Sequence, residues 1–195
     1  MKKGKAKRRH WMDAYDADRG WAPMWQARVW DPDLDWPRLP HTNGKDRFPI
    51  DFTFVTDRVA TGGGIWTEAD VATLRVAGIT HVVTAAAELH ATTASLLEGR
   101  MPYLLNGVKD DGTWKGAWWF AKTLEFTREA LADPDAKVYV HCWSGKNRGP
   151  SAAYAVLRDL GYTPGAAESL IRKARPKVLL LYRRDADEAL ERMAT

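Results

Sequence analysis

Hydrophobic and polar residues along the chain change their pattern near residue 50. Beyond Ile50, short apolar runs alternate with longer stretches in which apolar residues recur at helical spacing. Strands alternating with helices predict a mostly parallel sheet with helices packed on its faces, because parallel strands need crossover connections. We expect strands within residues 52–64, 79–87, 102–108 and 136–142, and helices over 67–77, 115–132, 149–160, 164–174 and 185–193.

Local signals support the helix boundaries. Thr67 is a good N-cap, and Glu68 and Asp70 follow in the first turn, where the helix dipole favours acids. Gly78 is suited to the position just beyond the same helix. The helix over 115–132 is expected to build its inner face from a set of large apolar side chains: Trp118, Trp119, Phe120, Leu124, Phe126 and Leu131.

The first 49 residues show no sustained period. Five prolines and several tryptophans occur between Trp11 and Pro49, and proline restricts both its own backbone and that of the preceding residue. We expect an irregular extension that either wraps the following domain and buries its indoles, or forms a platform for a substrate or partner. The expected organisation is this extension over 1–49 and a domain over 50–195.

Charge is unevenly distributed. Residues 1–9 hold six Lys and Arg and no acid, and without them 23 basic side chains remain against 25 acidic ones. The basic segment is either a solvated tail or a site for a polyanion such as nucleic acid.

Composition excludes several classes of protein. With 195 residues, 45% of them hydrophobic, the chain suits one compact domain with an appendage. No apolar run approaches the roughly 20 residues of a membrane span, and the basic N-terminus lacks the apolar region of a secretory signal. One cysteine permits neither an internal disulfide nor a zinc cluster. We therefore expect a soluble, cytoplasmic protein without a membrane span.

The segment VYVHCWSGKNRGPSAAYAVL carries the candidate chemistry. Cys142 ends an apolar strand, and a helix is predicted to begin just beyond Arg148, so the loop between them lies where parallel sheets gather ligands. Backbone N–H groups beside a helix N-terminus make an anion site, and Gly145 permits the left-handed turn that such a loop needs. The expected phosphate-binding residues are Trp143, Ser144, Gly145, Lys146 and Asn147.

The same groups favour nucleophilic chemistry at Cys142. N–H dipoles and a nearby arginine stabilise a thiolate, and the planar fork of Arg148 can bind two phosphate oxygens. A thiolate at the bottom of a phosphate site can attack phosphorus and form a cysteinyl-phosphate, which water then hydrolyses. The simpler alternative, an inert core cysteine, leaves Arg148 without a purpose.

The sequence His141-Cys142, five further residues and Arg148 resembles the signature loop of the cysteine-dependent protein tyrosine phosphatase superfamily. Residues 52–88 look like the start of a dual-specificity phosphatase domain, and 166–180 are similar to the helix and Arg-Pro segment that follow the loop there. The resemblance covers about residues 50–193. It implies an α/β fold with a central, mostly parallel sheet, and a phosphomonoester hydrolase, most simply a protein tyrosine or dual-specificity phosphatase.

The resemblance also assigns roles. In that family an aspartate about thirty residues before the cysteine is the general acid, and Asp110 or Asp111 fits, with Asp110 preferred. His141 is expected to order the loop and favour the thiolate. No cofactor and no metal are expected, since sulfur is the nucleophile and no ligand cluster is visible.

One departure from the family concerns turnover. The family usually has Ser or Thr directly after the arginine, whereas this chain has Gly149, so dephosphorylation should be slow unless Ser151 or a water substitutes. A phosphate-recognition module with little turnover is therefore one alternative. Lys146 favours a phosphoinositide or inositol phosphate as another substrate, and the basic residues 1–9 favour an RNA 5′-phosphate.

Overall fold

The computed structural model describes residues 50–194, together with the backbone of short strands within the first 49 residues. The predictions made for the tryptophan- and proline-rich extension and for the basic segment lie outside the described residues. The short strands pair as β1 with β4, β2 with β3 and β5 with β6. Their bounds are Arg9–His10 (β1), Tyr15–Asp16 (β2), Gly20–Trp21 (β3), Leu34–Asp35 (β4), Leu39–Pro40 (β5) and Asp46–Arg47 (β6).

A five-stranded sheet forms the centre of residues 50–194, in the order β10-β9-β11-β8-β7. Neighbouring strands run parallel from β10 to β8, and only the edge strand β7 is antiparallel to its neighbour. The sheet is therefore mostly parallel, as predicted. The strand bounds are Phe52–Phe54 (β7), Val59–Gly62 (β8), His81–Ala86 (β9), Tyr103–Val108 (β10) and Val138–His141 (β11).

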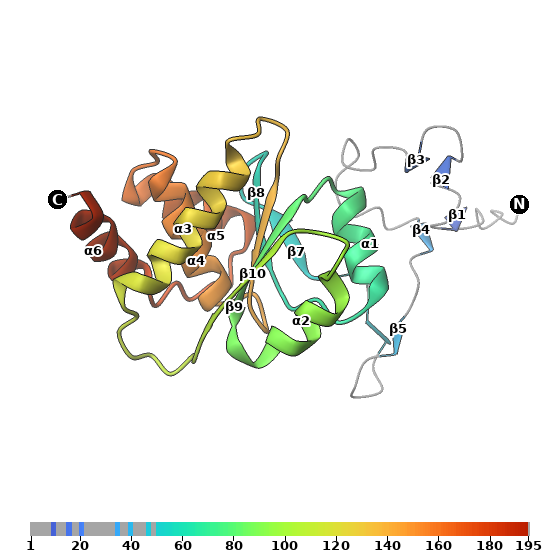
Figure 1. Cartoon of the computed structure of the whole chain (residues 1–195), viewed down its shortest axis with the longest axis horizontal. Coiled ribbons are helices and arrows are strands. Elements are labelled where there is room, and N and C mark those ends of the chain that lie inside the picture. The colour runs from blue at the N-terminus through green and yellow to red at the C-terminus, as the bar shows by residue number, and fades with distance from the viewer. Residues whose placement is uncertain are drawn as a thin grey trace, which may run out of the picture.

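Helices cover both faces of the sheet (Figure 1). Helices α1 and α2 contribute to one core, and α3 to α6 contribute to the other. No helix in residues 50–194 is long and apolar enough to cross a membrane. The helix bounds are Glu68–Val76 (α1), His90–Leu97 (α2), Ala117–Leu131 (α3), Arg148–Asp159 (α4), Pro164–Ala174 (α5) and Arg183–Ala194 (α6), with a 3-10 helix, η3, at Ala87–Leu89.

The buried strands supply both cores by alternation. In β9, Val82 joins the core beneath α1 and α2, whereas Val83 joins the core beneath α3 to α6. In β11, Tyr139 joins the first core, and Val138 and Val140 join the second. Successive side chains of a strand point to opposite faces, so a sheet with helices on both sides needs strands that are apolar throughout.

Two details differ from the sequence predictions. Trp118 was expected on the inner face of α3, but its side chain is 56% exposed, while Trp119 and Phe120 beside it are fully buried. The second difference is α2, which the sequence analysis did not predict. Its sequence, HATTASLL, has a weak apolar period, and it buries chiefly Thr93 and Leu97.

Candidate functional site

Cys142 lies directly beyond the carboxyl end of β11, the strand between β9 and β8. Its N–H donates to the carbonyl of Gly62 at the end of β8, at 3.3 Å, and the residue is 1% exposed. Three of the parallel strands therefore end around the cysteine, at the edge of the sheet where parallel folds place their ligands.

The backbone of residues 142–148 is held from outside through its carbonyl groups. Gly64 N–H donates to the Trp143 carbonyl at 3.0 Å, and Leu179 N–H donates to the Lys146 carbonyl at 2.8 Å. The N–H groups of Trp143, Lys146 and Asn147 donate to no acceptor among residues 50–194. The loop therefore uses carbonyl groups to bond to the surrounding chain and keeps these three N–H groups without an acceptor. Such an arrangement is suited to bind an anion.

Gly145 explains the tight course of this loop. Its φ angle is +65°, in the left-handed region, and a Cβ there would lie 2.5 Å from the carbonyl carbon of Gly62. Arg175 Nε donates to the Gly145 carbonyl at 3.1 Å, and its guanidinium pairs with Asp51. Only glycine fits this position without displacing the neighbouring backbone.

Arg148 is the first residue of α4 and is 4% exposed. Its Nη1 and Nη2 donate to the two carboxylate oxygens of Glu88 at 2.7 and 2.5 Å, and Nη1 also donates to the Val108 carbonyl at 2.9 Å. Its Nε is buried, makes no hydrogen bond, and lies 3.4 Å from Asp110 Oδ2. The guanidinium is thus fixed in orientation, and its Nε–H remains without a hydrogen-bond acceptor.

Glu88 is a residue of the site that the sequence analysis missed. It lies in η3, just beyond the carboxyl end of β9, so an acid directly after a buried strand was the signal for it. The hydrogen bond from Arg148 lowers the pKa of Glu88. The paired charge of Glu88 orients Arg148 in a site where an unpaired cation would be costly.

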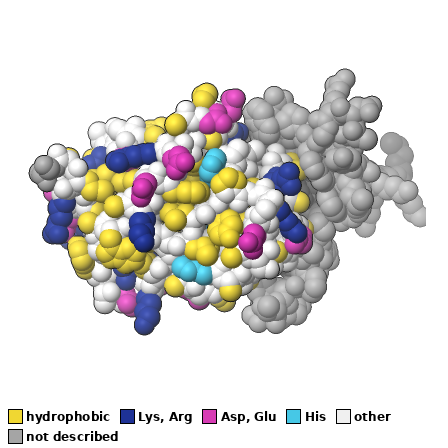
Figure 2. Space-filling model, viewed as in Figure 1, with side chains coloured by type: hydrophobic (Ala, Val, Ile, Leu, Met, Phe, Trp, Pro, Cys, Tyr) yellow, Lys and Arg dark blue, Asp and Glu magenta, His cyan; other side chains and the backbone are white. Residues whose placement is uncertain are grey.

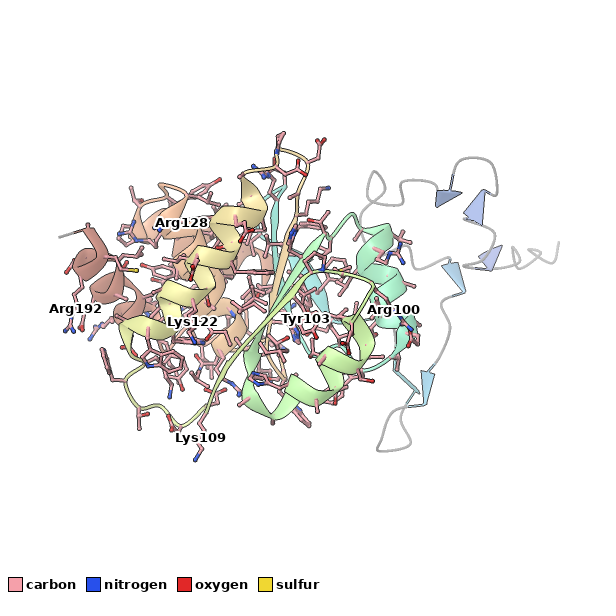
Figure 3. All side chains as sticks on the ribbon, viewed as in Figure 1. Arg100, Tyr103, Lys109, Lys122, Arg128 and Arg192 are labelled. Atoms are coloured by element: carbon pink, nitrogen blue, oxygen red, sulfur yellow. The ribbon has the colours of Figure 1, made fainter. Side chains whose placement is uncertain are left out.

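Asp110 belongs to the loop after β10 and reaches across to residues 142–148. Its Oδ1 accepts hydrogen bonds from Asn147 Nδ2 at 2.6 Å and from the hydroxyl of Tyr182 at 3.0 Å. Lys109, the residue before it, points away from the sheet (Figure 3). The structure therefore places Asp110 beside Arg148, while its chain neighbour leaves the site.

Asp111 faces a different environment. Its Oδ1 accepts from Lys115 Nζ at 2.6 Å and from the hydroxyl of Thr113 at 2.7 Å. These contacts, the Lys115 hydrogen bond first, hold the pKa of Asp111 well below its usual range. A carboxyl held so firmly in its ionised form is a poor proton donor near neutral pH.

His141, the last residue of β11, is completely buried and stacks on the ring of Tyr139 at 5.2 Å between centroids. Nδ1 lies 3.4 Å from the Cys142 carbonyl, which can only accept, so the ring proton belongs on Nδ1. Nε2 then accepts from the hydroxyl of Thr84 at 3.0 Å. Burial lowers the pKa of His141 to about 4, so the ring is neutral at pH 7 and orders the strand end without adding charge.

Gly149 and Ser151 lie in the first turn of α4. A Cβ on Gly149 would lie 2.9 Å from both Cys142 N and the His141 carbonyl carbon, so the helix start and the strand end are in close backbone contact. The hydroxyl of Ser151 is buried and has no hydrogen-bond partner in the described chain. It therefore makes no hydrogen bond to the sulfur of Cys142 in this structure.

The exposed rim of the site is apolar and basic. Trp143 is 50% exposed and meets the ring of Trp66 edge-on, with 4.6 Å between centroids. Lys146 and Ser144 are also exposed. Figure 2 shows one face of the described residues, on which hydrophobic side chains are interspersed with both basic and acidic ones. No group of three or more His, Cys, Asp or Glu side chains suited to a metal ion occurs in the part of the chain that the structure describes.

The structure brings most of the sequence-predicted residues to one place. Cys142, Arg148 and the loop between them lie together, Asp110 reaches Arg148, and Asp111 turns toward Lys115 instead. The sequence analysis named Asn147 only for its backbone and missed the hydroxyl of Tyr182. No local motif marks Tyr182, because its contact with Asp110 spans 72 positions of the chain.

No protein-family model matches the chain. Human DUSP28 has a similar structure, with a TM-score of 0.64 and 17% identity, over 77% of this chain and 100% of that one. A mouse putative dual specificity phosphatase complexed with zinc tungstate has a TM-score of 0.63 and 18% identity, over 78% of this chain and 94% of that one. PTPMT1 in complex with PI(5)P has a TM-score of 0.61 and 17% identity, over 73% of this chain and 98% of that one. The chain therefore has the fold of the dual-specificity and tyrosine phosphatases.

Proposed function

We propose that the protein is a phosphomonoester hydrolase that works through a cysteinyl-phosphate, most simply a protein tyrosine or dual-specificity phosphatase. One observation carries the proposal: a buried cysteine and a fixed arginine bound a loop with unpaired N–H groups, and Asp110 lies 3.4 Å from that arginine. An inert core cysteine would need neither the loop nor the arginine. The likeness of the fold to phosphatases supports the same function.

In the first step, the unpaired N–H groups of Trp143, Lys146 and Asn147, together with Arg148 Nε, bind the phosphate oxygens. The Cys142 thiolate attacks phosphorus, and the S–P bond forms as the P–O ester bond breaks. The electron pair of that bond leaves on the ester oxygen, which takes a proton from the Asp110 carboxyl. The alcohol or phenol departs, and the enzyme holds a cysteinyl-phosphate and an Asp110 carboxylate.

In the second step, a water molecule attacks phosphorus. Asp110 accepts a proton from that water, the new P–O bond forms, and the S–P bond breaks with its electron pair returning to Cys142. Inorganic phosphate leaves, and the thiolate and the protonated acid are restored. Gly149 offers no hydroxyl to assist the departing sulfur, so we expect this step to limit turnover.

The test is hydrolysis of a small aryl phosphate in EDTA between pH 5 and 8, with the full chain and Cys142→Ser. We expect activity only in the native chain, a burst of phenol equal to the enzyme concentration, and phosphate bound covalently to Cys142. Activity that survives in Cys142→Ser would overturn the proposal. Binding of tungstate without any turnover would favour the phosphate-recognition module.

A phosphoinositide or inositol phosphate is the second candidate substrate. Lys146 is exposed within the loop, where it can meet a second phosphate, and a similar structure was solved with PI(5)P. Comparing kcat/KM for a phosphotyrosyl peptide and a soluble inositol phosphate distinguishes the two. Lys146→Met should lower only the inositol phosphate value if this candidate is correct. The RNA 5′-phosphate alternative depends on residues 1–9, which lie outside the described part.

A further inference from the structure

We propose that Tyr182 is a positioning residue for the general acid, and that it selects Asp110 Oδ2 as the oxygen that carries the transferable proton. This inference rests on the proposed function. Its physical basis is a set of hydrogen bonds that join the loop over residues 109–116, the loop over 142–148 and the segment over 179–182.

Tyr182 bridges two points of the acid loop. Its hydroxyl donates to Asp110 Oδ1 at 3.0 Å and accepts from the N–H of Gly112 at 3.0 Å. The residue is 1% exposed, and its ring also lies beneath Lys115 Nζ, at 4.9 Å from the centroid. Burial raises the pKa of Tyr182, and the Asp110 bond adds to the effect, so the hydroxyl keeps its proton at neutral pH.

Asn147 completes the contacts of the same carboxyl oxygen. Its Nδ2 donates to Asp110 Oδ1 at 2.6 Å, and its Oδ1 accepts from the N–H of Leu181 at 2.8 Å. Asp110 Oδ1 therefore accepts two hydrogen bonds. Oδ2 accepts neither of them and lies 3.4 Å from Arg148 Nε, the donor that the proposed mechanism assigns to the phosphate. When phosphate is bound, the Nε–H of Arg148 donates to a phosphate oxygen in the proposed mechanism, whereas Oδ1 keeps both of its donors. A proton on Asp110 is then best placed on Oδ2.

The backbone around Tyr182 is held in an unusual conformation. Leu180 has a φ angle of +54°, the only positive value for a non-glycine residue in the described chain, and its side chain is fully buried. On either side of it, Leu179 N–H donates to the Lys146 carbonyl and Leu181 N–H to Asn147. A left-handed leucine costs energy and persists only where surrounding contacts require it. Here the turn at Leu180 lets the N–H groups of both Leu179 and Leu181 face the loop over 142–148.

The far end of the acid loop is fixed to the start of α6 as well. Lys115 N–H donates to Asp185 Oδ2 at 2.7 Å, one turn beyond Tyr182. The acid loop is thus attached at Asp110, Gly112 and Lys115 to one short stretch of chain. General acid catalysis depends on placing the proton within hydrogen-bonding reach of the leaving oxygen, and small displacements are costly. Loss of the Tyr182 hydroxyl should therefore harm proton delivery more than phosphate binding.

The experiment compares Tyr182→Phe with the native chain on two substrates. Nitrophenyl phosphate has a leaving group that departs readily as an anion, whereas the basic phenoxide of phenyl phosphate needs the proton. We expect kcat/KM for phenyl phosphate to fall about tenfold, and that for nitrophenyl phosphate to change less than about twofold. An equal loss on both substrates, or no loss on either, would overturn the proposal.

Tyr154→Phe is the matched control. Tyr154 is also 1% exposed, and its hydroxyl donates to a carboxylate of α6, Asp187, at 2.8 Å, but it has no contact with the acid loop. This variant should change kcat/KM on both substrates by a similar, small factor. A selective loss on phenyl phosphate in Tyr154→Phe would show that the effect is not specific to Tyr182.

A second measurement separates this inference from the proposed function. Amide hydrogen exchange of residues 109–116 should be faster in Tyr182→Phe and unchanged in Tyr154→Phe, whether or not the native chain hydrolyses phosphate. Unchanged exchange in Tyr182→Phe would overturn the positioning of the loop. Absence of a cysteinyl-phosphate in the native chain would instead overturn the proposed function, and the exchange result would still decide whether Tyr182 holds the loop.

Discussion

Asp110 and Asp111 are neighbours in the chain with opposite surroundings. Asp110 faces Arg148, whereas Asp111 is held ionised by Lys115 and Thr113. We expect Asp110→Asn to lower kcat/KM for phenyl phosphate by about 10²- to 10⁴-fold near neutral pH, because proton delivery is lost. Asp111→Asn should lower the same kcat/KM by less than about tenfold. Larger loss in Asp111→Asn than in Asp110→Asn would reverse the assignment.

Gly149 stands where the resemblance of the sequence leads us to expect Ser or Thr, but the structure leaves too little space there for a side chain. Any Cβ there must displace the backbone of His141 or Cys142, which lie within 2.9 Å of its position. Gly149→Ser should therefore be destabilising by about 1–3 kcal/mol, in spite of restoring a hydroxyl. Urea unfolding measures the stability, and the steady-state rate that follows the burst measures dephosphorylation. A stable Gly149→Ser with faster turnover would show that the helix start can shift freely.

His141 makes the stability of the fold depend on pH. Its pKa is lowered by burial to about 4, so between pH 6.5 and pH 4 the unfolded chain binds a proton that the folded one does not. The free energy of unfolding should fall as the pH drops through that window, by about 3 kcal/mol for this group. Between pH 6.5 and pH 4, the urea midpoint of His141→Gln should fall less steeply with decreasing pH than that of the native chain. Equal slopes in the two proteins would show that His141 is protonated when folded.

At the scale of elements, Arg175 joins three parts of the fold. From the end of α5 it donates to the Gly145 carbonyl and pairs through both Nη atoms with Asp51, just before β7. Arg175→Lys keeps the charge but loses the planar fork. We expect tungstate to bind about tenfold more weakly, because the loop over 142–148 loses an anchor worth about 1–3 kcal/mol.

Arg172→Lys is the control for that change. Arg172 lies on the same helix, where it pairs with Glu168 and donates to the Val178 carbonyl, and its guanidinium makes no hydrogen bond to residues 142–148. Isothermal titration calorimetry with tungstate compares the two variants. Similar affinities in both would mean that the loop keeps its shape without Arg175.

The elements themselves were largely predictable. Buried parallel strands are apolar throughout, and caps such as Thr67 mark a helix by local chemistry, so α1 begins and ends where its sequence indicates. Helix α2 was missed because alanine and threonine give no strong apolar period. Trp118 was misplaced because a tryptophan can lie on an exposed helix face as well as in a core.

The candidate site was predictable only in part, for a related reason. Cys142 and Arg148 are close in sequence, so a single loop motif reveals them. Glu88 and Tyr182 reach the site from 60 and 72 positions away from their partners. Such contacts depend on the order of strands and on the backbone turn at Leu180, and neither is written in a local pattern.

At the scale of the whole molecule, the distribution of charge gives a further prediction. Residues 1–9 carry six basic side chains in a chain whose remainder is slightly acidic. If they contact RNA, the logarithm of the RNA association constant should fall linearly with the logarithm of the salt concentration, with a slope between 0 and about −4. Deletion of residues 1–9 should abolish this binding. Fluorescence anisotropy with a labelled single-stranded RNA measures this. Salt-insensitive binding, or binding that survives the deletion, would exclude the contact.

The burial of Cys142 has a consequence for oxidative damage. A peroxide that reaches the thiolate converts it to a sulfenic acid, which many enzymes protect by condensing it with a second cysteine. The 195 residues hold no second cysteine, and Cys142 is 1% exposed. An oxidised Cys142 can therefore be reduced only by a thiol from another molecule, which must reach the buried sulfur. Oxidation of this protein at Cys142 would therefore leave no disulfide within the chain, and a mixed disulfide with the reducing thiol would be its only covalent trace.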